Sequence, residues 1–120
     1  LGQIEGGFVQ GAGWLTMEEV KWKADGKITT HSPSTYKIPA VNDMPGSFNV
    51  EIFKDGRNKE KVVNKSKTTG EPPLMNAMSV FFAIKDAISS VGNYHIIPTI
   101  DAPATPEKIL MSINSLKAKL

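Results

Sequence analysis

The strongest constraint on the fold is an apolar pattern of helical period in residues 73–92. Apolar side chains recur there at spacings of three and four residues, which places them on one face of an α-helix. Gly92 follows the last of them and is a typical helix terminator. The pattern predicts a helix of about five turns. Its predicted inward residues are Leu74, Ala77, Met78, Phe81, Ile84, Ile88 and Val91.

A single carboxylate stands at the entrance of this helix. Glu71 lies between Gly70 and the pair Pro72-Pro73. A residue that precedes proline is biased toward extended geometry, so Glu71 is predicted to lie in an extended segment just before the helix. The prolines have few backbone states and the glycine leaves room for another group, so the carboxylate is held as a general base must be. An acid that merely caps the helix would sit at the same place, and both roles remain open.

Residues 2–16 combine helical apolar spacing with a high glycine content. Each glycine costs a helix roughly 1 kcal/mol relative to alanine, so this density needs a reason. Glycine permits either close packing on a neighbouring element or close approach of a ligand, and the sequence leaves both open. A dinucleotide-binding fingerprint is absent, because the third glycine and the preceding strand are missing. The five glycines are Gly2, Gly6, Gly7, Gly11 and Gly13.

The region between the two helical patterns predicts antiparallel strands. Asp25-Gly26 is a hairpin signal that joins residues 20–24 to residues 27–31. Residues 34–39 are predicted to be extended, and residues 48–52 alternate as a strand with one buried face. The basic segment 57–67 has no aromatic residue on which a base could stack, so a solvated edge strand or loop is favoured over a nucleic-acid groove.

A last helix is predicted after residue 105. Thr105, Pro106 and Glu107 provide an N-cap, a proline at the first helical position and an acid in the first turn. The full order is a glycine-rich N-terminal helix, antiparallel strands and two C-terminal helices. This order predicts an α+β fold in one domain with a modest core. The last helix is predicted to turn inward Ile109, Leu110, Ile113 and Leu116.

Composition excludes several functional classes. A net charge of +2 does not indicate a nucleic-acid or acidic-membrane partner. The chain has no cysteine, which excludes disulfides, thiolate nucleophiles and cysteine-ligated metal centres within it. Its apolar runs are shorter than the roughly 20 residues of a membrane span, and no secretory signal opens the chain. A cytoplasmic, non-membrane protein is therefore predicted. His31 and His95 lack metal-binding spacing, and no serine-hydrolase elbow or P-loop occurs.

Four segments, in order, resemble one family. They are GQIEGGFVQGAG, PSTYKIPA, SK-x-x-GEPPL followed by FFAIKDA, and DAPATPEKI. Together they resemble the C-terminal end of the molybdenum hydroxylases, in particular the xanthine dehydrogenase branch, from Gly2 to about Ile109. Leu1 is not an initiator methionine, and residues 1–120 are expected to be a C-terminal fragment of the molybdopterin-binding domain of the aldehyde oxidase and xanthine dehydrogenase family.

The resemblance implies a chemistry and a set of site residues. Molybdenum would be held by a molybdopterin cofactor shared with upstream segments, with no metal ligand from this chain. Glu71 would be the general base for hydroxylation of an electron-poor purine carbon with oxygen from water. Gln3 and Gly70 would lie next to the cofactor. The full enzyme would be an oligomer that carries 2Fe-2S clusters and FAD on other domains or subunits, and the isolated fragment is expected to be inactive.

The chain also departs from the family pattern. Thr68 and Thr69 stand where family members commonly have alanine and valine, which changes the polarity beside the predicted base. The residues that grip a purine belong to upstream segments. Two alternatives therefore remain: an aldehyde oxidase-like hydroxylase with a different substrate, and a non-catalytic module for subunit assembly.

Overall fold

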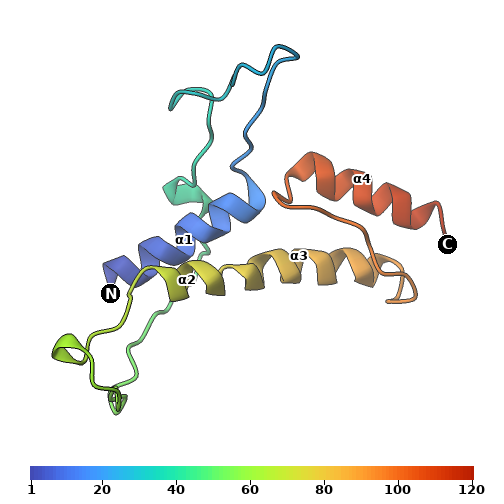
Figure 1. Ribbon diagram of the computed structural model, residues 1–120. Coiled ribbons are helices and arrows are strands. Elements are labelled where there is room, and N and C mark those ends of the chain that lie inside the picture. Colours follow the sequence, from blue (N-terminus) through green and yellow to red (C-terminus); the bar gives the residue numbers. More distant parts are fainter.

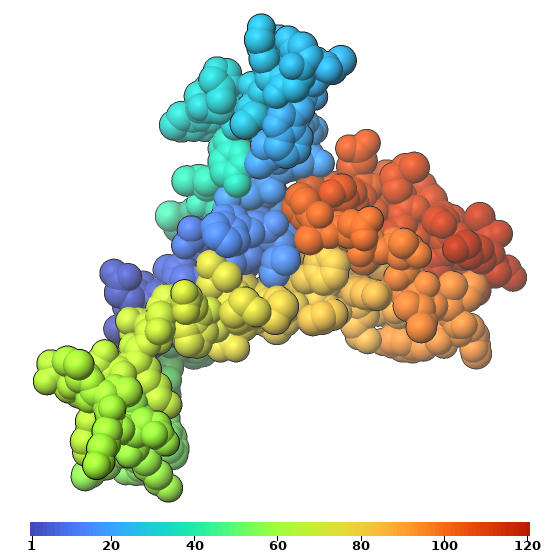
Figure 2. Space-filling model, viewed as in Figure 1, coloured from blue at the N-terminus to red at the C-terminus, as the bar shows by residue number.

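The computed structural model describes residues 1–120 as four α-helices from which two arms protrude (Figure 1). The helices are α1 (Gly2–Thr16), α2 (Glu71–Asn76), α3 (Met78–Val91) and α4 (Pro106–Lys117). An upper arm, residues 20–38, and a lower arm, residues 51–69, extend away from the helices (Figure 2). Two short 3-10 turns, η1 (Val41–Asp43) and η2 (Val63–Lys65), interrupt the irregular chain between α1 and α2.

Helices α2 and α3 form one nearly continuous rod, because Ala77 between them keeps helical backbone angles. Helix α1 lies along the first half of this rod, and α4 lies along the second half (Figure 1). The connection between α3 and α4 returns to the end of α1, where the Ala104 N–H donates to the Leu15 carbonyl at 2.7 Å. The buried apolar residues lie along these contacts; they are Ala77, Ile88, Ala104 and Leu116.

Glycines allow α1 to approach α2 closely. A Cβ atom placed on Gly11 would lie 2.5 Å from the Leu74 carbonyl oxygen and 2.8 Å from the Ala77 Cβ atom. A Cβ atom on Gly7 would lie 2.9 Å from the Gly70 carbonyl oxygen. Real Cβ atoms do not come so close to a neighbouring backbone, so only glycine permits this packing. Of the two explanations for the glycine content, close helix packing is therefore correct at Gly7 and Gly11.

The predicted C-terminus of α3 and the predicted N-terminus of α4 are confirmed. Gly92 caps the C-terminus of α3, and the Thr105 hydroxyl accepts the Lys108 N–H at 3.4 Å at the start of α4. The predicted inward faces are correct only in part. Ile88 and Leu116 are buried, whereas Met78, Val91 and Leu110 are exposed. The exposed residues lie on helix faces that no other element covers.

The predicted α+β fold is wrong, because the structure contains no β-strand. The predicted strand at residues 48–52 is irregular: Phe48 packs on Phe8 with ring centroids 5.5 Å apart, and Ile52 is exposed. Alternating side chains form a strand only when a neighbouring strand satisfies the backbone hydrogen bonds. No such neighbour lies beside residues 48–52, so these residues form no strand despite their alternating apolar side chains.

The upper arm retains the turn of the predicted hairpin but not its strands. Trp22 and Ile28 form an isolated antiparallel bridge around the turn, in which Gly26 has a φ of 81°. The Lys23 N–H donates to the Lys27 carbonyl at 2.9 Å. The turn predicted at Asp25-Gly26 is therefore confirmed. Two strands without a third strand or a packed face are marginally stable, which accounts for the single bridge.

The chain is open rather than compact. Its radius of gyration is 18.2 Å, whereas a compact domain of 120 residues has about 14 Å. Only 10 of the 120 residues are buried. The observed core is therefore smaller than the modest core predicted for one domain of this size. Large apolar side chains are correspondingly exposed, among them Trp22 at 63%, Phe53 at 78% and Phe82 at 59%.

The rod of α2 and α3, Glu71–Val91, is the one helical stretch that is long and apolar enough to cross a membrane, by length and composition only. Core helices of soluble proteins pass the same test. The rod carries the buried residues Ala77 and Ile88 and the charged residues Lys85 and Asp86. Packing against α1 and α4 therefore accounts for part of its apolar character.

The exposed apolar surface leads to a first prediction. The isolated 120-residue chain is expected to self-associate and to bind a dye that fluoresces on apolar surfaces, because the exposed side chains exceed what a monomer normally presents. Size-exclusion chromatography with light scattering and dye fluorescence measure these properties. A monomer that unfolds in one sharp transition and binds no dye would contradict the prediction.

Candidate functional site

Glu71 begins α2. The predicted extended geometry at Glu71 is wrong, since the residue is the first of the helix and is followed within the first turn by Pro72 and Pro73. The first four N–H groups of a helix have no partner inside it, so prolines that lack an N–H are tolerated there. The helix can therefore start before the two prolines rather than after them.

Contacts with α1 hold the start of α2 in place. Pro73 is buried, and its Cβ atom lies 3.3 Å from the position that a Cβ on Gly7 would take. The Leu74 N–H donates to the Gly70 carbonyl at 3.2 Å and closes the first turn. The backbone on both sides of Glu71 is thus fixed by packing and by hydrogen bonding.

The Glu71 side chain itself is unpaired. It is exposed, it takes part in none of the side-chain hydrogen bonds or ion pairs, and no side chain caps the N-terminus of α2. A carboxylate in the first turn still interacts favourably with the helix dipole. The capping hydrogen bond that would account for Glu71 structurally is nevertheless not formed, and the carboxylate is free to meet another group.

Glu71 lines a shallow concavity of about 500 Å³ on the outer side of α2. Lys67 and Thr68, near the end of the lower arm, form one wall, and Pro72 and Met75 contribute apolar surface. The Lys67 ammonium and the Glu71 carboxylate form no ion pair within 4.0 Å. A cation, an anion, a hydroxyl group and apolar surface therefore line one concavity.

Gln3 lies near the same end of the helix pair. It is one helical turn before Gly7 on α1, and Gly7 contacts Gly70, the residue before Glu71. The Gln3 side chain is exposed and makes no hydrogen bond within the chain. The structure thus places the N-terminal end of α1, which carries Gln3, beside the N-terminal end of α2, which follows Gly70.

The glycines at this end remain open. A Cβ atom placed on Gly2, Gly6 or Gly70 would meet no other atom within 4 Å. The glycines of α1 and α2 near this site therefore differ in role: Gly7 and Gly11 serve helix packing, whereas Gly2, Gly6 and Gly70 leave backbone accessible beside Gln3 and Glu71. Close approach of a ligand, the second explanation for the glycine content, is sterically possible at this second group.

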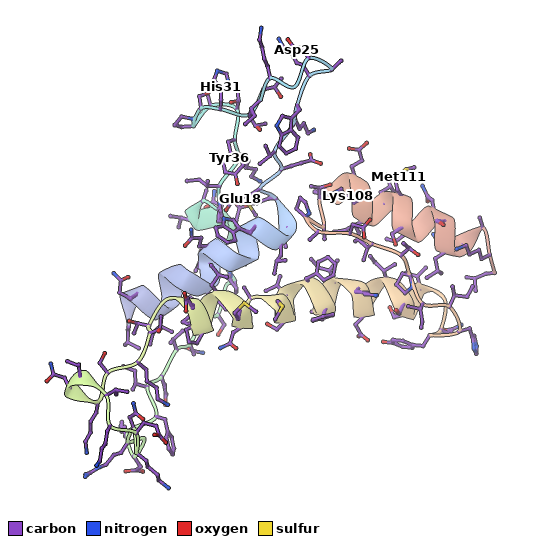
Figure 3. All side chains as sticks on the ribbon, viewed as in Figure 1. Glu18, Asp25, His31, Tyr36, Lys108 and Met111 are labelled. Carbon is purple, nitrogen blue, oxygen red and sulfur yellow. The ribbon has the colours of Figure 1, made fainter.

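A second cluster of polar contacts lies at the other end of α1 (Figure 3). The Tyr36 hydroxyl donates to a Glu18 carboxylate oxygen at 2.7 Å, and this hydrogen bond, with burial, raises the pKa of Tyr36. Glu19 forms ion pairs with Lys21 at 3.1 Å and with Lys108 at 4.0 Å. Glu18 and Glu19 are thus half-buried and paired rather than freely solvated. Tyr36 and Lys108 are distant in sequence from these carboxylates, and no local pattern indicates their pairing with Glu18 and Glu19.

No three His, Cys, Asp or Glu side chains gather where they could hold a metal ion. His31 lies in the upper arm, where its Nδ1 atom is 3.1 Å from the Thr29 carbonyl oxygen, and Figure 3 shows it far from Lys108 on α4. His95 is exposed in the connection between α3 and α4. Any metal at the Glu71 end would therefore need ligands from another source.

Comparison with known proteins adds an independent observation. Residues 1–45 match the family described as a molybdopterin cofactor-binding domain. Xanthine dehydrogenase of Oryza sativa subsp. japonica is 46% identical over 131 residues, which is 99% of this chain and 9% of the relative. Xanthine dehydrogenase/oxidase of Rattus norvegicus is 48% identical over 114 residues, 91% of this chain and 8% of the relative. The chain thus spans less than a tenth of the length of these relatives.

Proposed function

Because the chain is homologous to the C-terminal part of the xanthine dehydrogenases, we propose that it supplies the catalytic base of a molybdenum hydroxylase whose active site is completed by other segments of a larger protein. The reaction is hydroxylation of an electron-poor carbon of a purine with oxygen from water. The observation that carries the proposal is the Glu71 carboxylate, which is fixed through its backbone and unpaired at its side chain.

Glu71 has the properties that a general base needs. Such a group must be held within reach of the proton that it removes and must be free to accept it. The contact of Pro73 with Gly7 restricts the backbone, whereas the exposed carboxylate has no competing hydrogen bond. In this role a Glu71 carboxylate oxygen accepts the proton of the attacking water-derived oxygen. The Glu71→Gln variant tests the role, with loss of turnover expected while the cofactor stays bound.

The residues around Glu71 fit a bulky cofactor. Gly2, Gly6 and Gly70 leave space beside the backbone, and the free Gln3 amide offers both donors and an acceptor. Gln3 and Gly70 are the residues that would hold the molybdopterin group. This group, when bound, supplies the two-electron oxidation of the substrate carbon. Because the chain has no metal-ligating cluster, the metal would be held by the pterin and by upstream segments.

The remaining features of the enzyme belong to the same proposal. Residues 1–120 form a fragment of the molybdopterin-binding domain, and iron–sulfur clusters and FAD lie on other domains or subunits of a cytoplasmic oligomer. The large exposed apolar surface of the chain supports its assembly with such parts. A purine is favoured over an aldehyde because the relatives described above are xanthine dehydrogenases.

The role of Gln3 leads to a second prediction. Gln3→Ala in the parent protein should leave a buried polar group of the cofactor unpaired, at a cost of about 1–3 kcal/mol. The expected result is molybdopterin that dissociates about tenfold more readily, from protein that remains folded. The molybdenum-to-protein ratio after dialysis measures the effect.

Gln10→Ala is the matched control for this prediction. Gln10 is also exposed on α1 but lies three residues beyond Gly7, away from the Glu71 end. Its replacement should leave the molybdenum content unchanged. If Gln3→Ala retains full occupancy and full turnover, Gln3 is an ordinary helix residue.

A further inference from the structure

We propose that Lys67 is a specificity-determining residue that favours heterocyclic substrates carrying a negative charge. This inference rests on the proposed function of Glu71, because both side chains line the same concavity. The lower arm carries six basic residues, and Lys67 is the one among them that reaches this concavity; they are Lys54, Arg57, Lys59, Lys61, Lys65 and Lys67.

The positive charge of Lys67 is the physical basis of the proposed preference for anionic substrates. An anionic heterocycle that approaches Glu71 is repelled by the carboxylate, since two like charges a few ångströms apart interact unfavourably even in an open surface concavity. The Lys67 ammonium lines the same concavity and attracts the anion, which offsets this repulsion. It is available for the task because it forms no ion pair with Glu71 or with any other carboxylate of the chain.

The remaining lining fits a flat heterocycle. Pro72 and Met75 present apolar surface, and the Thr68 hydroxyl can donate to or accept from a ring substituent. A ring that rests on Pro72 and Met75 could direct an anionic oxygen toward Lys67 and the carbon that reacts toward Glu71. The surface at this point thus combines shape, charge and hydrogen bonding on one side of the predicted base.

The test compares two probes that differ in charge. Urate is an anion at neutral pH, and unsubstituted purine is uncharged. In the parent protein, Lys67→Gln should weaken urate binding about fivefold, the upper range for an exposed charge pair, while purine binding changes by less than about twofold. Lys67→Arg should retain urate affinity because it keeps the charge. Equilibrium dialysis measures both dissociation constants without turnover, and the urate effect should shrink at high salt.

Lys65→Gln is the matched control. Lys65 is an exposed lysine of the same arm that does not line the concavity. If it weakens urate binding as much as Lys67→Gln does, the general field of the arm is responsible and the inference is wrong. Equal effects of Lys67→Gln on urate and purine would also overturn it. Normal turnover of Glu71→Gln would instead overturn the proposed function, which keeps the two failures distinguishable.

Discussion

Glu71→Gln in the parent protein is expected to lower turnover about 100-fold or more while the protein stays folded and loaded with its cofactor. Glutamine keeps the size of the side chain and an acceptor oxygen but cannot take up a proton, and a positioned base contributes a factor of this order. A purely structural role for Glu71 in the first turn of α2 predicts a different result, a stability loss of at most about 1 kcal/mol with turnover intact. Steady-state kinetics at a measured molybdenum content separates the two roles.

Glu107→Gln is the matched control for this experiment. Glu107 also lies in the first turn of a helix, α4, and follows a proline. Its neutralisation repeats the change in charge at a helix N-terminus but lies outside the concavity of Glu71. Turnover of this variant should be unchanged. If both variants lose activity equally, the loss reflects helix stability rather than proton transfer.

Glu71→Asp and the pH profile sharpen the test. Aspartate keeps the charge but withdraws it by one methylene, and misplacement of about 1 Å can cost on the order of 100-fold. The acidic limb of kcat/KM against pH should be present in the parent protein and absent in Glu71→Gln, because the limb reports protonation of the base. A Glu71→Gln enzyme with near-normal turnover and full cofactor would leave Glu71 only a structural role.

Gly11→Ala is expected to destabilise the folded protein. The added methyl group would lie 2.5 Å from the Leu74 carbonyl oxygen, a backbone atom that cannot rotate away. Helix α1 must then separate from α2, at a cost of about 1–3 kcal/mol, and the start of α2 with Glu71 moves with it. Thermal inactivation of the cofactor-free parent protein and its yield of folded material measure the loss.

Gly6→Ala makes the same chemical change on the same helix with the opposite expected sign. No atom lies within 4 Å of a Cβ placed on Gly6, so alanine should stabilise α1 by about 1 kcal/mol. The two variants should therefore differ by about 3 kcal/mol in the stability of the cofactor-free protein. If both variants behave alike, helix propensity alone governs the helix, and the packing of Gly11 on α2 does not limit stability.

The helices and two of their ends, the end of α3 and the start of α4, could be predicted from the sequence because their signals are local. The apolar period of residues 73–92, the terminator Gly92 and the cap Thr105 each act within a turn or two of the chain. The turn at Asp25-Gly26 is local in the same sense. The sequence alone also indicated Glu71 as the candidate base. It could not indicate that Glu71 begins the helix, since the bias before proline competes with tolerance of proline in the first turn.

Only the tertiary structure decided which contacts the same residues make. Whether a glycine of α1 packs or stays open depends on whether α2 passes beside it, as it does at Gly11 and not at Gly6. The alternating residues 48–52 form no strand because strand formation needs a partner that this chain does not provide. The pairing of Tyr36 with Glu18 likewise joins residues far apart in sequence. Such contacts depend on the relative positions of distant segments, which no local pattern encodes.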